Sequence, residues 1–154
     1  STSLQQGKIE KWYQAVICGK PVDNNGTYVD YLKQDKKNNC SRIVDKSDPE
    51  SKRAELEYKV LDCIRTEEKD SQYLSLVEIK LLTGRHHQIR VQFSGHGTPL
   101  YGDGKYGNNE KAVKKSLALC ACHLKFKHPA TGKIMDFQIK PDTGAFKLFS
   151  KSND

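Results

Sequence analysis

The feature that most constrains the fold is a pair of alternating segments, residues 54–66 and 72–82, separated by the charged residues 67–70. In the first segment Leu56, Tyr58 and Val60 alternate with charged residues, and the second segment places its apolar residues on one face in the same way. A period of two is that of a β-strand with one face in the core. A short charged stretch between two such strands is typical of a turn. The two segments therefore predict a β-hairpin and a protein built on an antiparallel sheet.

After Thr83 and Gly84 the spacing of the sequence changes to that of a helix. Residues 86, 89, 90 and 93 are spaced i, i+3, i+4 and i+7, and Gly95 and Gly97 end the pattern. Strand-like composition recurs in residues 8–19, 27–32, 117–128 and 133–140. Several strands with one central helix, in a chain of 154 residues, predict a single α+β domain on a mainly antiparallel mixed sheet with few helices.

Residues 33–53 do not follow this pattern, because almost all of them are polar. Only Cys40, Ile43 and Val44 are apolar in this stretch. The Asn-Asn-Gly sequence at residues 24–26 is a turn signal that precedes the short strand expected at 27–32. A polar stretch as long as 33–53 is uncommon inside a compact domain. We expect it to be either a functional flap or disordered.

The net charge of +7 lies mostly in the C-terminal third of the sequence. From Leu100 to Asp154 there are 10 Lys and Arg against 5 Asp and Glu. Such an excess favours polyanions, nucleic acid above all, although a lysine-rich soluble surface has the same composition. No apolar run approaches the ~18 residues of a membrane span, and no signal-peptide pattern begins the sequence. We expect a monomeric cytoplasmic protein without a membrane partner.

The five cysteines are odd in number and have no C-x-x-C spacing, which fits reduced thiols in the cytoplasm. Cys120 and Cys122 lie two apart in an expected strand, with His123 and His128 nearby. This grouping leaves a Cys/His metalloprotein open as an alternative. His123 would point away from both cysteines, because side chains alternate along a strand. We therefore expect no metal.

The segment with the densest chemistry is residues 82–107. Arg90 shares a helical face with Ile89 and Phe93, so its guanidinium is expected to point inward. A buried arginine needs an acidic partner, because an unpaired buried charge is very costly. The partner is either an acidic ligand or an acid of this chain such as Asp103. The free N–H groups at the helix start also favour an anion nearby.

Residues 83–91, Thr-Gly-Arg-His-His-Gln-Ile-Arg-Val, resemble the T-G-R-x-H-Q-I/L-R-V signature of the RluA-type RNA pseudouridine synthases. Three further blocks agree in order and spacing: K-x-Y-x-A at residues 11–15, G-D-x-x-Y-G at 102–107 and F-x-H-P at 126–129. The resemblance extends from about residue 9 to residue 141. It implies that residues 1–154 form the C-terminal portion of one pseudouridine synthase catalytic domain.

The resemblance also implies an activity. The family isomerises uridine to pseudouridine in structured RNA, ribosomal or transfer, with neither metal nor organic cofactor, and flips the target nucleotide into a pocket. By the motif match, Arg90 stands at the arginine that pairs with the catalytic aspartate, and Tyr13 at the tyrosine that stacks on the base. A packed strand aromatic is the alternative for Tyr13. Asp103 is expected to organise the glycine-rich loop. The residues assigned to RNA contacts are Arg85, His87, Gln88 and Lys105, with local hydrogen bonding as the alternative for His87 and Gln88.

The catalytic aspartate of the family lies in an H-R-L-D motif, and no such sequence occurs in the 154 residues. In the family this motif precedes the K-x-Y-x-A block. We therefore expect the parent protein to be an enzyme and this chain to be an inactive fragment of its catalytic domain. The alternative from another functional class is a non-catalytic RNA-binding module that uses the basic C-terminal part.

Overall fold

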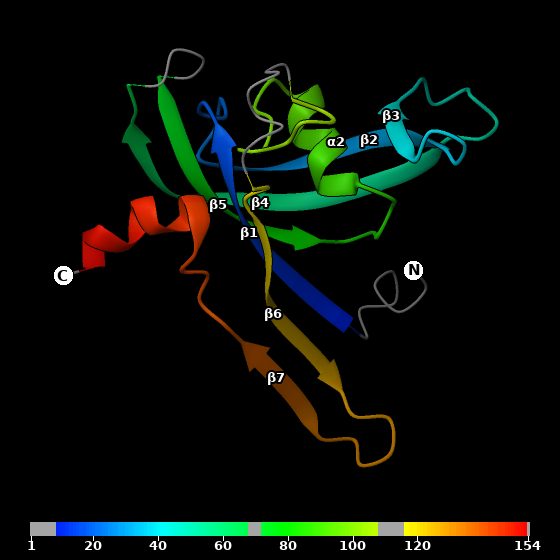
Figure 1. Ribbon diagram of the computed structural model, residues 1–154. Coiled ribbons are helices and arrows are strands. Elements are labelled where there is room, and N and C mark those ends of the chain that lie inside the picture. Colours follow the sequence, from blue (N-terminus) through cyan, green and yellow to red (C-terminus); the bar gives the residue numbers. More distant parts are fainter. Residues whose placement is uncertain (1–8, 68–71, 108–115, 154) are drawn as a thin grey trace.

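A seven-stranded sheet forms the body of the protein in the computed structural model, which describes residues 9–67, 72–107 and 116–153 (Figure 1). The strands lie in the order β3-β2-β4-β5-β1-β6-β7, and every neighbouring pair is antiparallel. This arrangement confirms the predicted α+β fold. The strand bounds are β1 Ile9–Cys18, β2 Asn25–Asp35, β3 Cys40–Ile43, β4 Lys52–Arg65, β5 Tyr73–Leu81, β6 Leu119–Lys127 and β7 Ile134–Gln138.

The hairpin predicted from the alternating segments is β4–β5. Leu56 lies opposite Leu81, and Tyr58 lies opposite Ile79. All four side chains are buried on one face, whereas Glu57 points to solvent. The period of two in the sequence therefore corresponds to the two faces of this sheet. Most of the predicted turn, residues 68–70, lies outside the described residues.

Two helical segments cover opposite faces of the sheet: α2 (Gln88–Gly95) and the 3-10 helix η2 (Gly144–Asn153). Ile17 of β1 packs in one core cluster with Phe93 of α2. Its neighbour Val16 packs in another with Phe146 of η2. Because successive strand residues point to opposite faces, β1 joins both cores. The helix α2 was predicted; η2 was not. No helix in the described parts of the chain is long and apolar enough to cross a membrane.

The polar stretch 33–53 contains the end of β2, all of β3 and the start of β4, so of the two alternatives, a functional flap or disorder, disorder was wrong. The strand β2 begins at Asn25, within the predicted turn, and continues to Asp35, where it turns into β3. At the tip Asn39 takes a positive φ of 48°. The hairpin lies against α2 so closely that a Cβ at Gly95 would collide with Ile43. Polar residues predominate because β3 is an edge strand, and its order comes from these contacts.

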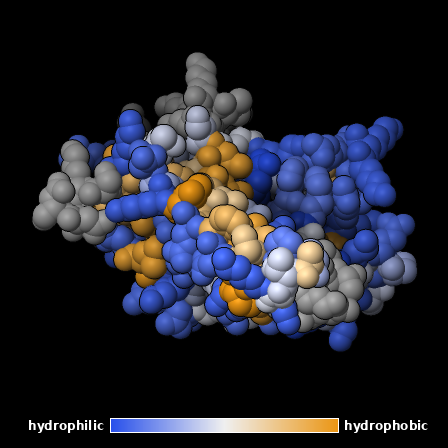
Figure 2. Space-filling view, turned by 90° about the horizontal axis from the view of Figure 1, so that it is seen from below, coloured by the Kyte–Doolittle hydropathy of each residue, from blue (hydrophilic) through white to orange (hydrophobic). Residues whose placement is uncertain are grey.

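The far end of the sheet is formed by β6 and β7, which project away from α2 (Figure 1). Ile134, Phe137 and Ile139 are each more than half exposed there. Figure 2, which views the molecule from below, shows apolar side chains gathered across an otherwise hydrophilic face. The described residues thus leave β7 as an edge strand with exposed apolar side chains.

Candidate functional site

The loop between α2 and β6 is organised by the buried carboxylate of Asp103. One oxygen, Oδ1, accepts hydrogen bonds from the backbone N–H groups of Lys105 (3.1 Å) and Tyr106 (3.0 Å). The guanidinium of Arg90 also binds the carboxylate through both an Nη2–Oδ1 contact of 2.8 Å and an Nε–Oδ2 contact of 3.0 Å. The Asp103 side chain is 0% exposed and that of Arg90 19%. Of the two partners considered for Arg90, the structure shows the acid of this chain.

The electrostatics of this pair favour its charged form. Burial alone would raise the pKa of the Asp103 carboxyl, but the hydrogen bonds and charge of Arg90, with the two backbone N–H donors, bring its pKa below the ordinary value. The hydrogen bond to Asp103 raises the pKa of Arg90 against the opposing effect of burial. Both groups are therefore ionised at neutral pH.

Tyr106 joins this ion pair to the helix start and to the β2–β3 hairpin. The Arg90 guanidinium carbon lies 5.0 Å from the centre of the Tyr106 ring. The Tyr106 hydroxyl accepts a hydrogen bond from the backbone N–H of Ser41 at 3.0 Å. It lies 2.6 Å from Nδ1 of His87, to which it can donate its own proton. Burial and the positive charges of neighbours lower the pKa of His87, so a neutral ring accepts this proton.

Substituting Tyr106 by Phe tests this junction. We expect Tyr106→Phe to lower the free energy of unfolding by about 1–2 kcal/mol, because His87 and the Ser41 N–H lose their partner. Urea denaturation followed by circular dichroism measures the change. Tyr13→Phe is the matched control, since it removes a hydroxyl that has no hydrogen bond among the described residues. Equal losses in the two variants would show that the junction is not stabilising.

His86 and Lys105 fix the hairpin tip to the same region. His86 lies between the Ser41 hydroxyl (Nδ1–Oγ 2.8 Å) and the Asn39 side-chain oxygen (Nε2–Oδ1 3.0 Å). The ammonium of Lys105 donates to the Asn39 carbonyl at 2.6 Å. Sequence reasoning assigned His86 no catalytic role and left it as either an RNA contact or a local hydrogen bonder. No signal in the polar stretch 33–53 linked His86 to the hairpin.

Gln88 is a local hydrogen bonder, the alternative given above for this residue. Its side chain is buried, and Oε1 accepts hydrogen bonds from the Thr83 hydroxyl (2.8 Å) and the Arg85 backbone N–H (2.9 Å). Its Nε2 donates to the Glu55 carbonyl at 3.1 Å. Gln88 therefore holds the turn before α2 against β4. Arg85 is partly exposed, and its Nε donates to the carbonyl of Arg53 at 2.9 Å.

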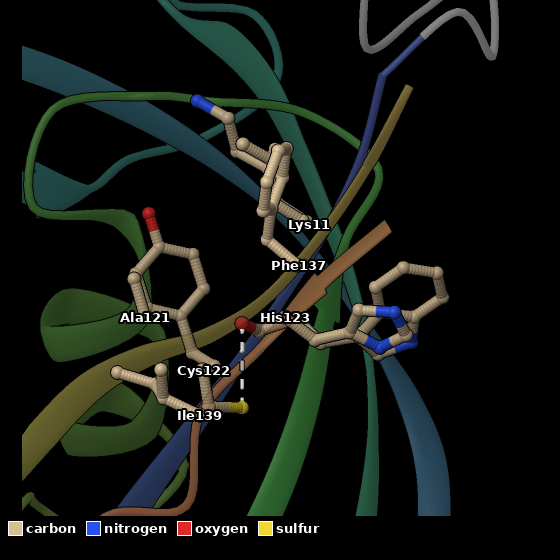
Figure 3. Close-up of a pocket in the computed structure, with 9 residues that line it drawn as sticks. Lys11, Ala121, Cys122, His123, Phe137 and Ile139 are labelled. Carbon is tan, nitrogen blue, oxygen red and sulfur yellow. Dashed lines mark hydrogen bonds between the residues drawn. The ribbon is translucent and has the colours of Figure 1, made fainter. Parts of the chain in front are cut away.

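Tyr13 lies on β1 between Ile79 and Ala121 of the flanking strands. It packs against the core cluster that contains Ile89 and Phe93, so it is on the α2 face of the sheet with Arg90. It also lines a pocket of about 300 Å³ between β1, β6 and β7. Figure 3 shows this pocket, with Phe137 and Ile139 toward opposite ends. The other lining residues are Lys11, Trp12, Ala121, Cys122, His123 and Leu124.

The cysteine and histidine side chains of β6 have partners of their own. His123 stacks on Trp12 and lies 2.7 Å from the Asp136 carboxylate. The thiol of Cys122 contacts the Trp12 carbonyl at 3.5 Å, and burial raises its pKa to about 11. In the parts of the chain that the structure describes, no three His, Cys, Asp or Glu residues are grouped to hold a metal ion.

Comparisons with known proteins agree in the kind of protein they find. A family model described as RNA pseudouridylate synthase matches residues 1–95. Ribosomal large subunit pseudouridine synthase D of Zymomonas mobilis is 35% identical over 140 residues, which are 86% of this chain and 41% of the relative. An uncharacterized RNA pseudouridine synthase of Aquifex aeolicus is 34% identical over 149 residues, 91% of this chain and 45% of the relative. The chain thus spans less than half the length of these relatives.

The fold of this chain also matches that of solved structures of two human proteins. The human RNA Pseudouridylate Synthase Domain Containing 1 superposes with a TM-score of 0.75 at 21% identity, over 92% of this chain and 58% of that chain. The human RNA Pseudouridylate Synthase Domain Containing 4 superposes with a TM-score of 0.73 at 22% identity, over 96% of this chain and 64% of that chain.

Proposed function

Since this chain belongs to the RNA pseudouridylate synthase family, we propose that it is the C-terminal portion of an enzyme that converts uridine to pseudouridine in structured RNA. One observation carries the proposal. Asp103 binds Arg90 through Nε and Nη2, and Nη1 has no hydrogen-bond partner among the described residues. A guanidinium held along one edge can pair a second carboxylate along the other. Such a carboxylate is the one that the family's catalytic aspartate would provide.

Tyr13 has the complementary role in this proposal. It offers an aromatic surface at a pocket on the α2 face of the sheet, and a flipped base needs such a surface. Arg85, His87 and Lys105 contact the RNA, and Gln88 orients Arg85. The reaction needs neither metal nor organic cofactor. The substrate is ribosomal or transfer RNA, and the enzyme acts as a monomer in the cytoplasm, where its free cysteines stay reduced.

The chain as it stands is expected to be inactive. It contains no H-R-L-D sequence, and the carboxylate that Arg90 binds is buried and already accepts hydrogen bonds from Arg90, Lys105 and Tyr106. A carboxylate in that state is a poor nucleophile. We expect neither tritium release from RNA that carries uridine tritiated at C5 nor a covalent adduct with RNA that contains 5-fluorouridine. Turnover by the purified chain would contradict this expectation.

The experiment that tests the function joins to Ser1 of this chain a portion of the Zymomonas mobilis relative that this chain does not match, in which we expect the H-R-L-D motif. The joined protein is expected to release tritium from ribosomal RNA tritiated at uridine C5, because pseudouridine formation replaces the hydrogen at that carbon. Changing the aspartate of the supplied motif to Asn is the control and should abolish the release. Salt-dependent RNA binding without release, by a folded joined protein, would favour the non-catalytic RNA-binding module instead.

A further inference from the structure

A second basic site lies where the β2–β3 hairpin meets the turn before α2. It is a pocket of about 300 Å³, which we call the hairpin pocket. Three of its lining side chains are cationic, those of Lys36, Lys52 and Arg85, and one is anionic, that of Glu50. The other lining residues are Leu32, Gln34, Ser41, Gly84 and His86.

The charges at the hairpin pocket are unbalanced. Glu50 lies 3.3 Å from the ammonium of Lys33, outside the pocket lining, so its charge is already offset. Lys36, Lys52 and Arg85 form no ion pair among the described residues. Like charges gathered around a concave surface repel one another and attract a counterion. The pocket therefore favours an anion.

The walls of the hairpin pocket are held in place before any ligand binds. His86 is fixed by the Ser41 hydroxyl and by Asn39, as described above. The backbone N–H of Arg85 is bound by Gln88, and its Nε by the Arg53 carbonyl. Only the terminal nitrogens of its guanidinium lack a hydrogen-bond partner among the described residues. A cation anchored in this way loses little freedom when it binds an anion, which favours affinity.

We propose that the hairpin pocket binds a backbone phosphate of the RNA. The proposal rests on the function proposed above and deepens it by assigning part of the RNA path to the β2–β3 hairpin. Arginine and lysine are the side chains that bind phosphate oxygens most readily. The pocket also adjoins the Arg90 site: the ring of His86 stacks on that of His87 at 3.8 Å, and His87 binds Tyr106. One strand of RNA can therefore reach both sites.

The test compares two triple variants of the full chain with equal charge. The pocket variant carries Lys36→Gln, Lys52→Gln and Arg85→Gln. The control variant carries Lys59→Gln, Lys133→Gln and Arg65→Gln, which remove two lysines and one arginine exposed away from the pocket. Fluorescence anisotropy with a labelled RNA hairpin gives the affinity at several KCl concentrations. We expect the pocket variant to bind about tenfold more weakly than the control, and to lower the slope of log affinity against log salt by about 0.7–1.

A single substitution of opposite sign completes the test. Glu50→Gln removes the one carboxylate of the pocket and is expected to raise RNA affinity by about twofold or more. If thermal unfolding shows that the pocket variant is not folded, the Glu50→Gln measurement alone tests the phosphate site. Equal losses in the pocket and control variants, or a Glu50→Gln protein that binds no better than wild type, would overturn the phosphate site alone. A folded wild-type chain that binds no RNA would also overturn the phosphate site, whereas the proposed function is overturned by a folded joined protein that releases no tritium.

Discussion

Substituting Asp103 by Asn should lower the free energy of unfolding by about 3 kcal/mol, the largest loss of stability that we expect from an isosteric change in this protein. The substitution keeps an oxygen that can accept the N–H groups of Lys105 and Tyr106. It removes the charge that pairs with Arg90, whose side chain is only 19% exposed. The cost is therefore that of leaving a largely buried cation without its partner. Urea denaturation at pH 7 measures it.

Asp35 provides a matched control, because its carboxylate makes the same local turn. Its Oδ1 accepts the backbone N–H groups two and three residues ahead, those of Lys37 and Asn38. That turn is exposed and its carboxylate forms no ion pair among the described residues. Asp35→Asn should therefore change the free energy of unfolding far less. Similar losses in the two variants would contradict a dominant role for the Arg90 pair.

The pH dependence of the unfolding free energy gives a second test of the Asp103→Asn variant. Because the folded-state pKa of Asp103 lies below its ordinary value, its contribution is complete above the unfolded pKa of about 3.9 and is lost as the pH falls through the folded pKa. The difference in unfolding free energy between wild type and Asp103→Asn should be constant from pH 7 to about pH 5. It should shrink below about pH 4. A difference that grows on acidification would contradict the assignment of the charge.

The second large effect is expected from Arg90 in the joined protein that carries the supplied aspartate. Arg90→Gln should lower kcat for tritium release by about a hundredfold or more, because the nucleophilic carboxylate loses its cationic partner. The same change leaves Asp103 buried without its ion pair, so a loss of stability accompanies it. Stability and activity must therefore be separated before the residue is given a role in the reaction.

The double variant Arg90→Gln with Asp103→Asn separates them. It replaces the ion pair by two neutral amides of similar size, which removes the unpaired charge and should restore most of the unfolding free energy. Activity should stay as low as in Arg90→Gln, because the supplied aspartate still lacks its partner. Recovery of kcat together with stability would show that Arg90 acts only by holding the loop. Single-turnover rates and urea denaturation, measured on the same preparations, give the two quantities.

Much of this fold follows from local pattern. The alternation around Leu56 and Tyr58 predicts β4, and the i, i+3, i+4, i+7 spacing that ends at Phe93 predicts α2, because each element buries one face. The 3-10 helix η2 was missed although Phe146 and Phe149 stand three residues apart, because one such pair is too short a pattern to predict a helix. Phe146 and Phe149 are buried by a sheet face that forms from strands far away in the sequence. Local pattern cannot indicate such a face.

The sequence predicted some residues of the candidate site but not the contacts between them. Motif matches indicated Arg90 and Tyr13 as candidates. The helical spacing left two kinds of partner open for the arginine, and the loop geometry shows that one of them is Asp103. Gln88 is of a residue type usually found at the surface, yet it is buried because its amide joins two segments, the turn before α2 and β4. The β2–β3 hairpin is ordered by side chains such as His86, which lies 45 residues from Ser41 in the sequence. Neither hydrophobic periodicity nor secondary-structure propensity can indicate contacts at that separation.

The interior position of β1 in the sheet affects the order in which the strands of the protein can pair. Ile9 at its start pairs with Phe126, and Lys11 pairs with Leu81, so one of the earliest described strands needs two of the later ones as neighbours. Pairings of that span carry a large loop-closure entropy and slow the folding of a chain. On the ribosome β1 would emerge well before β6, and the edge of β1 that pairs with β6 would stay unpaired until β6 has been synthesised. Tyr13 lies on this strand, so its surroundings are completed only when nearly the whole chain has been synthesised.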